Sequence, residues 1–279
     1  MKESKIHNGW ELNFSFPLGG RNNKPRTSGI TMIIDKGMGP RETRDLLEMS
    51  AEYIDFWKLG FGTSALYNPL FLKQKIEMIN AYGIKVYPGG TFAEIAISQG
   101  KFALFLERAK ELGFSAIEIS DGTIHLAPEE RSRAIQTARK MGFQVLAEVG
   151  KKDAGGAFNP EHAARQVNRD LEDGAFKVIL EARESGKNVT IYTEQGHVKQ
   201  EKLTKLLRQI PDPNKLIWEA PLTAQQIQFI TMFGSNVNLG NIQGKDVISL
   251  ESMRRGLRSD TFRLSLMEKY SGNQEQASL

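Results

Sequence analysis

The chain has 279 residues, no cysteine, and 37 lysine and arginine residues against 33 aspartate and glutamate residues. Hydrophobic residues make up 40% of it, which is enough to bury a large core and excludes a disordered chain. The lack of cysteine excludes disulfides, thiolate metal sites and a cysteine nucleophile. No apolar run approaches the ~18 residues of a membrane span and no signal core follows Met1, so we expect a cytoplasmic protein without a membrane partner.

The small excess of positive charge is spread along the chain. The formal net charge is +4, and basic residues are interleaved with acidic ones, as in 41–45 and 107–111. That pattern is typical of solvated helix faces rather than of a nucleic-acid surface. We therefore expect no nucleic-acid partner.

From residue 29 onward, short apolar or β-branched segments alternate with segments of helical period. The expected strands are 30–35, 54–59, 84–87, 116–120, 145–149, 178–182, 216–219 and 237–239. The expected helices are 41–52, 69–82, 92–112, 128–141, 160–174, 200–209, 223–233 and 246–257. Thr91 and Glu94 have the spacing of a capping box at the start of the third helix.

Eight strand–helix alternations predict parallel βαβ units, which occur in a closed (β/α)8 barrel and in an open doubly wound sheet. The barrel is favoured because eight units close a barrel and because no G-x-G-x-x-G follows the first strand. We therefore predict an α/β fold with one (β/α)8 TIM-barrel domain over 29–260, an N-terminal extended arm over 1–28 and a C-terminal tail over 261–279. The arm would pack on the barrel or on a neighbouring subunit, and we expect a homo-oligomer.

Several expected strands carry a charged residue near an end that is usually apolar in a barrel. Glu118, Glu148, Glu181 and Glu219 each stand late in an apolar segment, and Lys58 stands late in the second strand. A carboxylate that faced the layer between strands and helices would be costly unless it were paired. We therefore expect these side chains to point into the barrel mouth. There they form either an ion-pair network, for example Lys58 with Glu118, or the ligands of a hard cation such as Mg2+.

Three segments are candidates for binding an anion. Gly240 and Asn241 lie at the end of strand eight, where many barrels bind phosphate. Gly90, in the segment 88–91 after strand three, precedes an expected helix, although a glycine pair is often only a tight turn. Arg183 carries a guanidinium fork that suits carboxylate, phosphate or sulfite oxygens.

Several long segments in order resemble the phosphosulfolactate synthase family. They are 28–37 (SGITMIIDKG), 53–64 (YIDFWKLGFGTS), 178–186 (VILEARESG), 217–221 (IWEAP) and 236–242 (NVNLGNI). The resemblance extends from about residue 24 to 260. It implies a (β/α)8 barrel and a carbon–sulfur lyase of sulfolactate biosynthesis. Such an enzyme adds sulfite to phosphoenolpyruvate with Mg2+ and forms (2R)-phospho-3-sulfolactate.

That reaction suggests roles for the charged strand ends. A divalent ion would stabilise the enediolate-like charge that develops when sulfite attacks. We expect some of Asp35, Glu118, Glu148 and Glu219 to hold it, and we count Glu181 among the catalytic residues.

The intermediate then needs a proton at the carbon that bears the phosphate. A lysine suits this step, and we expect Lys151 or Lys152 to supply the proton. Lys152 is favoured because period-two alternation places it on the same strand face as Glu148.

The implied substrates are two anions, phosphoenolpyruvate and sulfite. We expect the phosphate to contact Gly240 and Asn241, with Gly90 as a second anion site. Lys58 or Arg183 would contact sulfite or the carboxylate.

Two other functions stay open at this point. Plant heat-stress-associated proteins share the fold of this family and are implied to protect proteins rather than to catalyse synthesis, although the charged strand ends argue against an idle site. The second alternative is an enolase- or aldolase-like barrel that acts on another phosphorylated three-carbon acid. Dependence on sulfite separates the two enzymes, and absence of any Mg2+ or substrate binding would favour the non-catalytic class.

Overall fold

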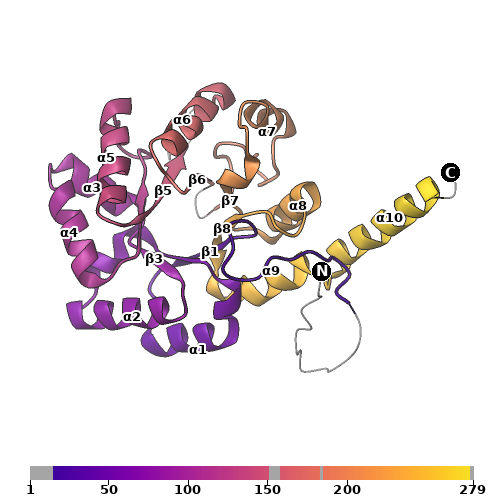
Figure 1. Cartoon of the computed structure of the whole chain (residues 1–279), viewed down its shortest axis with the longest axis horizontal. Helices are drawn as coiled ribbons and strands as arrows, with labels where there is room; N and C mark the ends of the chain where they lie inside the picture. The colour runs from indigo at the N-terminus through magenta and orange to yellow at the C-terminus, as the bar shows by residue number, and fades with distance from the viewer. Residues whose placement is uncertain (1–14, 151–157, 183–184, 277–279) are drawn as a thin grey trace.

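The structure is a computed structural model that describes residues 15–150, 158–182 and 185–276, and side chains as far as residue 267. Within these residues eight parallel strands form one sheet that curves into a barrel, with helices outside it (Figure 1). The strands are β1 (Thr31–Asp35), β2 (Phe56–Leu59), β3 (Lys85–Tyr87), β4 (Ala116–Ile119), β5 (Gln144–Val149), β6 (Lys177–Leu180), β7 (Leu216–Glu219) and β8 (Leu239–Gln243). The predicted (β/α)8 fold is confirmed.

The helices fill the connections between consecutive strands and continue beyond β8. The α-helices are α1 (Pro40–Ser50), α2 (Pro69–Ala81), α3 (Gly90–Ser98), α4 (Phe102–Leu112), α5 (Pro128–Lys140), α6 (Pro160–Glu172), α7 (Gln200–Leu207), α8 (Thr223–Phe233), α9 (Val247–Arg254) and α10 (Ser259–Gln276). Short 3-10 helices are η1 (Ala51–Tyr53), η2 (Gly60–Leu66), η3 (Pro213–Lys215) and η4 (Gly244–Asp246). None of the helices in the described ranges is long and apolar enough to cross a bilayer.

The strand order in the sheet is β3-β2-β1-β8-β7-β6-β5-β4, so β3 and β4 are its two ends. Ser115, just before β4, joins these ends. Its N–H donates to the Val86 carbonyl at 3.1 Å, and its Oγ accepts from the Val86 N–H at 3.0 Å. A serine side chain therefore replaces one backbone ladder bond where the barrel closes.

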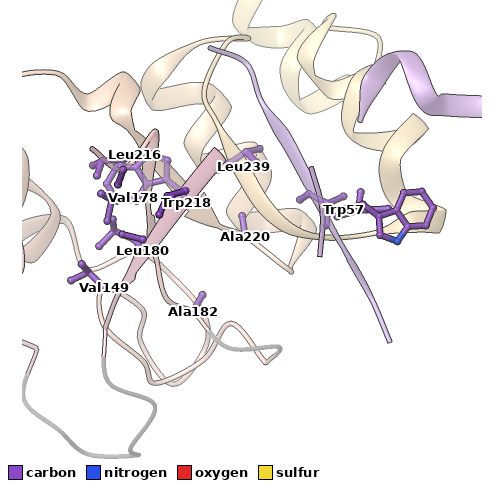
Figure 2. Packing of buried hydrophobic residues seen from close by; sticks show 14 of the residues in the cluster. Trp57, Val149, Val178, Leu180, Ala182, Leu216, Trp218, Ala220 and Leu239 are labelled. Atoms are coloured by element: carbon purple, nitrogen blue, oxygen red, sulfur yellow. The ribbon is translucent and has the colours of Figure 1, made fainter. Parts of the chain in front are cut away.

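Period-two alternation divides the strand residues between the barrel interior and the helix layer. The interior apolar layer consists of Ile30, Met32, Phe56, Tyr87, Ala116, Leu146, Ile179 and Ile217, all buried. The alternate strand residues belong to a second cluster that packs under the helices. Figure 2 shows part of this second cluster, in which Val178, Leu180, Leu216 and Trp218 lie close together.

Three elements differ from the sequence-based prediction. The helix expected over 92–112 is divided into α3 and α4, because Gly100 has a left-handed φ of 66° between them. Strand eight begins at Leu239, because the Asn238 side chain donates to the carbonyls of Asn214 and Leu216 and accepts from the Ile30 N–H. The residues expected as a tail form most of helix α10, which extends away from the barrel (Figure 1).

The described part of the N-terminal arm, 15–28, contains no helix or strand and lies against α9. Leu18 donates its N–H to the Arg255 carbonyl at 3.1 Å, and Arg21 Nε pairs with Glu251 at 3.0 Å. Residues 1–14 of the predicted arm lie outside the described residues. Arg21 Nη1 also donates to the carbonyl of Gly29, two residues before β1, so the arm lies at the N-terminal end of that strand.

Gly240 takes the β8 position of the interior apolar layer, where a side chain does not fit. A Cβ at this position would collide with Met32 Cε and lie 3.1 Å from Ile217 Cγ2. We predict that Gly240→Ala lowers the free energy of unfolding by about 1–3 kcal/mol, because the core must shift to admit one methyl group. Urea denaturation measures the change. Gly19→Ala is the control, because nothing lies within 4 Å of the added methyl group, and equal midpoints for the two variants would contradict the packing argument.

Candidate active site

A layer of charges lies directly above the interior apolar layer, at the C-terminal ends of the strands. Its members stand two positions after Phe56, Ala116, Leu146, Ile179 and Ile217, and therefore point to the same side of their strands. They are Lys58, Glu118, Glu148, Glu181 and Glu219, and all five are buried. The expectation that these side chains point into the barrel mouth is confirmed.

Lys58 is the centre of this layer. Its Nζ lies 3.1 Å from Glu118 Oε2, 3.3 Å from Glu148 Oε2 and 3.5 Å from Glu219 Oε1. Burial by itself would lower the pKa of Lys58, but the three carboxylates outweigh burial and raise the pKa well above its usual range. Lys58 is therefore an ammonium ion at any physiological pH. The ion pair with Glu118 that the sequence suggested is present, and it is one of three.

Glu148, Glu181 and Glu219 form a second, overlapping group. Each can offer one carboxylate oxygen so that the three oxygens lie within 4.8 Å of one another, and all three residues are buried. Burial raises the pKa of Glu219, Lys58 acts in the opposite direction, and the charge of Glu148 raises it further. Convergent carboxylates in a shielded position fit the ligand set of a hard divalent cation.

Backbone contacts fix two of these glutamates. Glu219 Oε2 accepts from the Ala182 N–H at 2.8 Å, and the Glu219 carbonyl accepts from the Tyr192 hydroxyl at 2.5 Å. The Glu148 carbonyl accepts from Arg131 Nη2 at 2.8 Å, and Arg131 is itself held by Asp170 at 2.7 Å. The strand ends that carry the acidic groups are thus anchored from the helix layer.

Gly90, a predicted anion site, binds a carboxylate of the protein. Its N–H, at the start of α3, donates to Glu118 Oε1 at 2.7 Å. A Cβ at Gly90 would collide with Ser120 Oγ and lie 2.5 Å from Glu118 Oε1. Glycine is therefore needed here so that α3 can approach the charged layer.

The sequence did not single out Glu94 as a site residue. It predicted a capping box of Thr91 and Glu94, which is wrong because α3 begins at Gly90 with Gly89 as its N-cap. Glu94 accepts from Ser120 Oγ at 2.5 Å and from the N–H groups of Gly122, Thr123 and Ile124 at 2.8–3.2 Å. Its carboxylate thus shapes the loop after β4. The buried, acidic position in an otherwise apolar helix was the only sequence signal for this role.

Asp35, a predicted metal ligand, belongs to a separate ion pair. Its Oδ2 lies 2.6 Å from Lys75 Nζ and accepts from Trp57 Nε1 at 2.9 Å, while Oδ1 accepts from the N–H groups of Gly37 and Met38 at 2.8 Å. These contacts fix the loop after β1. Among the described residues, the glutamate group with converging oxygens includes neither Asp35 nor Glu118, and Glu118 contacts Lys58 instead.

A cavity of about 530 Å³ opens above the charged layer, and Lys58, Glu181 and Glu219 form part of its floor. Asn241 also lines it, with a buried side chain and a left-handed φ of 54°. The register between β1 and β8 shifts next to this residue, so that Asn241 is an extra residue in β8. The neighbouring Gly240 faces the interior apolar layer instead.

Lys151, Lys152 and Arg183, the remaining predicted site residues, lie outside the described residues.

Comparisons with known proteins show the family to which the chain belongs. A protein-family profile for (2R)-phospho-3-sulfolactate synthase matches residues 19–260. The chain is 48% identical over 236 residues to a phosphosulfolactate synthase of Methanocaldococcus jannaschii, covering 84% of this chain and 94% of the relative. It is 44% identical over 250 residues to that of Methanothermobacter thermautotrophicus, covering 89% and 96%.

Two more distant matches are a plant protein and a solved structure. The protein HEAT-STRESS-ASSOCIATED 32 of Arabidopsis thaliana is 25% identical over 265 residues, covering 84% of this chain and 88% of the relative. A crystal structure of 3-hexulose-6-phosphate synthase superposes with a TM-score of 0.52 at 14% identity, covering 81% of this chain and 98% of that chain. The second likeness concerns the fold alone.

The crowding of carboxylates predicts that Glu219→Gln stabilises the metal-free protein at neutral pH. The pKa of Glu219 is higher in the folded than in the unfolded chain, so the stability linked to its proton is present at low pH and is lost as the pH rises through the folded value. Glutamine keeps an acceptor for the Ala182 N–H and removes the charge. In the presence of EDTA, the urea midpoint of Glu219→Gln should be higher than that of wild type, by an amount equivalent to about 1 kcal/mol in the free energy of unfolding. This difference between the two proteins should be larger at pH 7 than at pH 5.

Glu251→Gln is the matched control for this experiment. Glu251 is a buried glutamate balanced by Arg21 at 3.0 Å and Arg255 at 2.8 Å, so its replacement should destabilise the protein. A Glu219→Gln variant that is less stable than wild type at every pH would show that the glutamate layer is not electrostatically strained.

Proposed function

Since the chain belongs to the (2R)-phospho-3-sulfolactate synthase family, we propose that it is a lyase that adds sulfite to phosphoenolpyruvate and forms (2R)-phospho-3-sulfolactate. The observation that carries the proposal is the buried layer of one lysine and four glutamates beneath a cavity at the barrel mouth. The addition forms a bond between the sulfite sulfur and the CH2 carbon of phosphoenolpyruvate. The electrons of the C=C bond move toward the carboxylate, and a proton is then added to the carbon that bears the phosphate.

We assign Mg2+ to Glu148, Glu181 and Glu219, whose oxygens converge within 4.8 Å. This set keeps two of the four ligands expected from the sequence, and it adds Glu181. Asp35 is left out because Lys75, Trp57 and two backbone N–H groups use its oxygens. When bound, the ion would stabilise the negative charge that develops on the substrate carboxylate.

The substrate anions would lie in the cavity between Lys58 and Asn241. Lys58 supplies a positive charge. Asn241 has a left-handed backbone conformation at a strand irregularity and lines the cavity there. The Cα of Gly240 shapes the layer beneath, and the contact of its backbone with phosphate stays a prediction. Arg183 is kept as a proposed anion ligand on the grounds of its guanidinium alone.

Sulfite consumption tests the activity directly. Purified protein mixed with phosphoenolpyruvate, sulfite and Mg2+ should consume sulfite, and EDTA should stop the reaction because the carboxylate-held ion is removed. Consumption of phosphoenolpyruvate without sulfite would favour another enzyme of the barrel class. Protection of an unfolding client protein with no turnover would instead favour the role of the heat-stress-associated relative.

The metal assignment predicts the behaviour of Glu148→Gln. This variant lacks one charged ligand of the proposed site, so the Mg2+ concentration that it needs for half-maximal activity should be about tenfold or more higher than for wild type. Glu201→Gln is the control, because Glu201 is exposed and pairs only at the surface with Lys205 at 2.6 Å. Equal Mg2+ dependence of the two variants would remove Glu148 from the ligand set.

The proton donor is proposed from the sequence to be Lys151 or Lys152, with Lys152 favoured. Replacement of the donor by alanine should reduce turnover by about a hundredfold or more, while the other single variant keeps most of its activity. Full activity of both single variants would show that the proton comes from elsewhere. The homo-oligomer expected from the sequence also stays a prediction, and light scattering measures it.

A further inference from the structure

Lys58 and the assigned metal ligands use the same carboxylates. Two of the three contacts of the Lys58 ammonium group are to Glu148 Oε2 and Glu219 Oε1, at 3.3 and 3.5 Å. Both residues also belong to the group whose oxygens converge within 4.8 Å. A divalent ion in that group would therefore lie beside a fixed positive charge.

The lysine cannot move away from this position without disrupting the layer. Its side chain is 10% exposed, and Gly89 covers the stem. A Cβ at Gly89 would lie 3.7 Å from Lys58 Cε and 3.2 Å from the Leu59 carbonyl, and the φ of Gly89 is 79°. The backbone after β3 thus passes over the lysine at a distance and in a conformation that favour glycine.

The Lys58 ammonium group has opposite effects on the empty and on the metal-bound glutamate group. Carboxylates this close repel one another strongly in a buried site, and an ammonium ion at hydrogen-bond distance offsets that repulsion. The same ammonium ion repels a divalent cation that binds to the same oxygens. One residue thus stabilises the empty site and weakens the occupied one.

We propose that Lys58 is a resident counter-ion of the metal site, a positioning residue that holds the glutamates together without metal and keeps divalent-ion affinity low enough for the ion to exchange. This inference rests on the metal site assigned above. It differs from a role for Lys58 in substrate binding alone, because a substrate ligand would not affect metal affinity in the absence of substrate.

Titration of the whole protein with Mn2+, followed by the electron paramagnetic resonance signal of the free ion, tests the proposal without substrate or turnover. Mn2+ is a suitable probe because it prefers the same oxygen ligands as Mg2+. Lys58→Met should bind Mn2+ at least about tenfold more tightly than wild type, because the repulsive charge is gone. Without metal the melting temperature of this variant should be lower than that of wild type, and Mn2+ should raise it by more.

Lys177→Met is the matched control. Lys177 is also a buried lysine, but it lies at the start of β6, at the opposite end of the barrel, and donates to the Asn214 carbonyl at 2.5 Å. Its replacement should leave Mn2+ affinity unchanged. An equal gain in affinity for both variants would show a general effect of net charge and would overturn the proposal.

A second pair of variants keeps the test valid if Lys58→Met does not fold. Glu118→Gln and the double variant Lys58→Met/Glu118→Gln differ only at Lys58, and the double variant loses one charge of each sign. The double variant should bind Mn2+ more tightly than Glu118→Gln, and equal or weaker binding overturns the proposal. If neither the wild type nor any variant binds Mn2+, the assigned metal site is wrong as well. If Mn2+ binds with the same affinity whether or not Lys58 is present, the metal site stands and only the proposal for Lys58 is overturned.

Discussion

The contact between Lys58 and three glutamates is the interaction around which the barrel mouth is organised. Four carboxylates in one buried layer would repel one another, and a lysine from β2 that reaches Glu118, Glu148 and Glu219 makes their shared position possible. The layer below is apolar except for the Tyr87 hydroxyl, which donates to Met32 Sδ, so it supplies few polar partners for the charges. The polar partners come instead from the loops and helices above and outside the strands.

Those partners explain why residues far from the cavity matter to it. Arg131, on α5, holds the carbonyl of Glu148, and the start of α3 supplies an N–H to Glu118. Glu94, one turn further along α3, ties down the loop that follows β4. Residues of α3 and α5 thus hold the carboxylates and strand ends of the charged layer in place, as expected for a site whose geometry must be fixed before a ligand arrives.

The sequence predicts the barrel and the inward direction of the charges, because both follow from strand periodicity. It predicts the Lys58–Glu118 pair but not the contacts of Lys58 to Glu148 and Glu219, since distances across a barrel depend on strand stagger. The ion pair of Asp35 with Lys75 was missed for a similar reason, because Lys75 comes from a helix packed outside the strand. The sequence also does not show that a side chain at position 240 would collide with Met32, because that contact joins β8 to β1.

The pairing of β1 with β8 has a consequence for how the barrel is assembled. In the strand order, β8 is the link between β3-β2-β1 on one side and β7-β6-β5-β4 on the other. Apart from β8, the described residues join the two groups through the bonds between Ser115 and Val86 and through side-chain contacts such as that of Lys58 with Glu118. The continuous sheet therefore requires the first strand to pair with the last, a contact between distant parts of the chain of the kind that slows folding. Asn241 belongs to that strand, so the complete lining of the cavity depends on the same β1–β8 pairing that makes the sheet continuous.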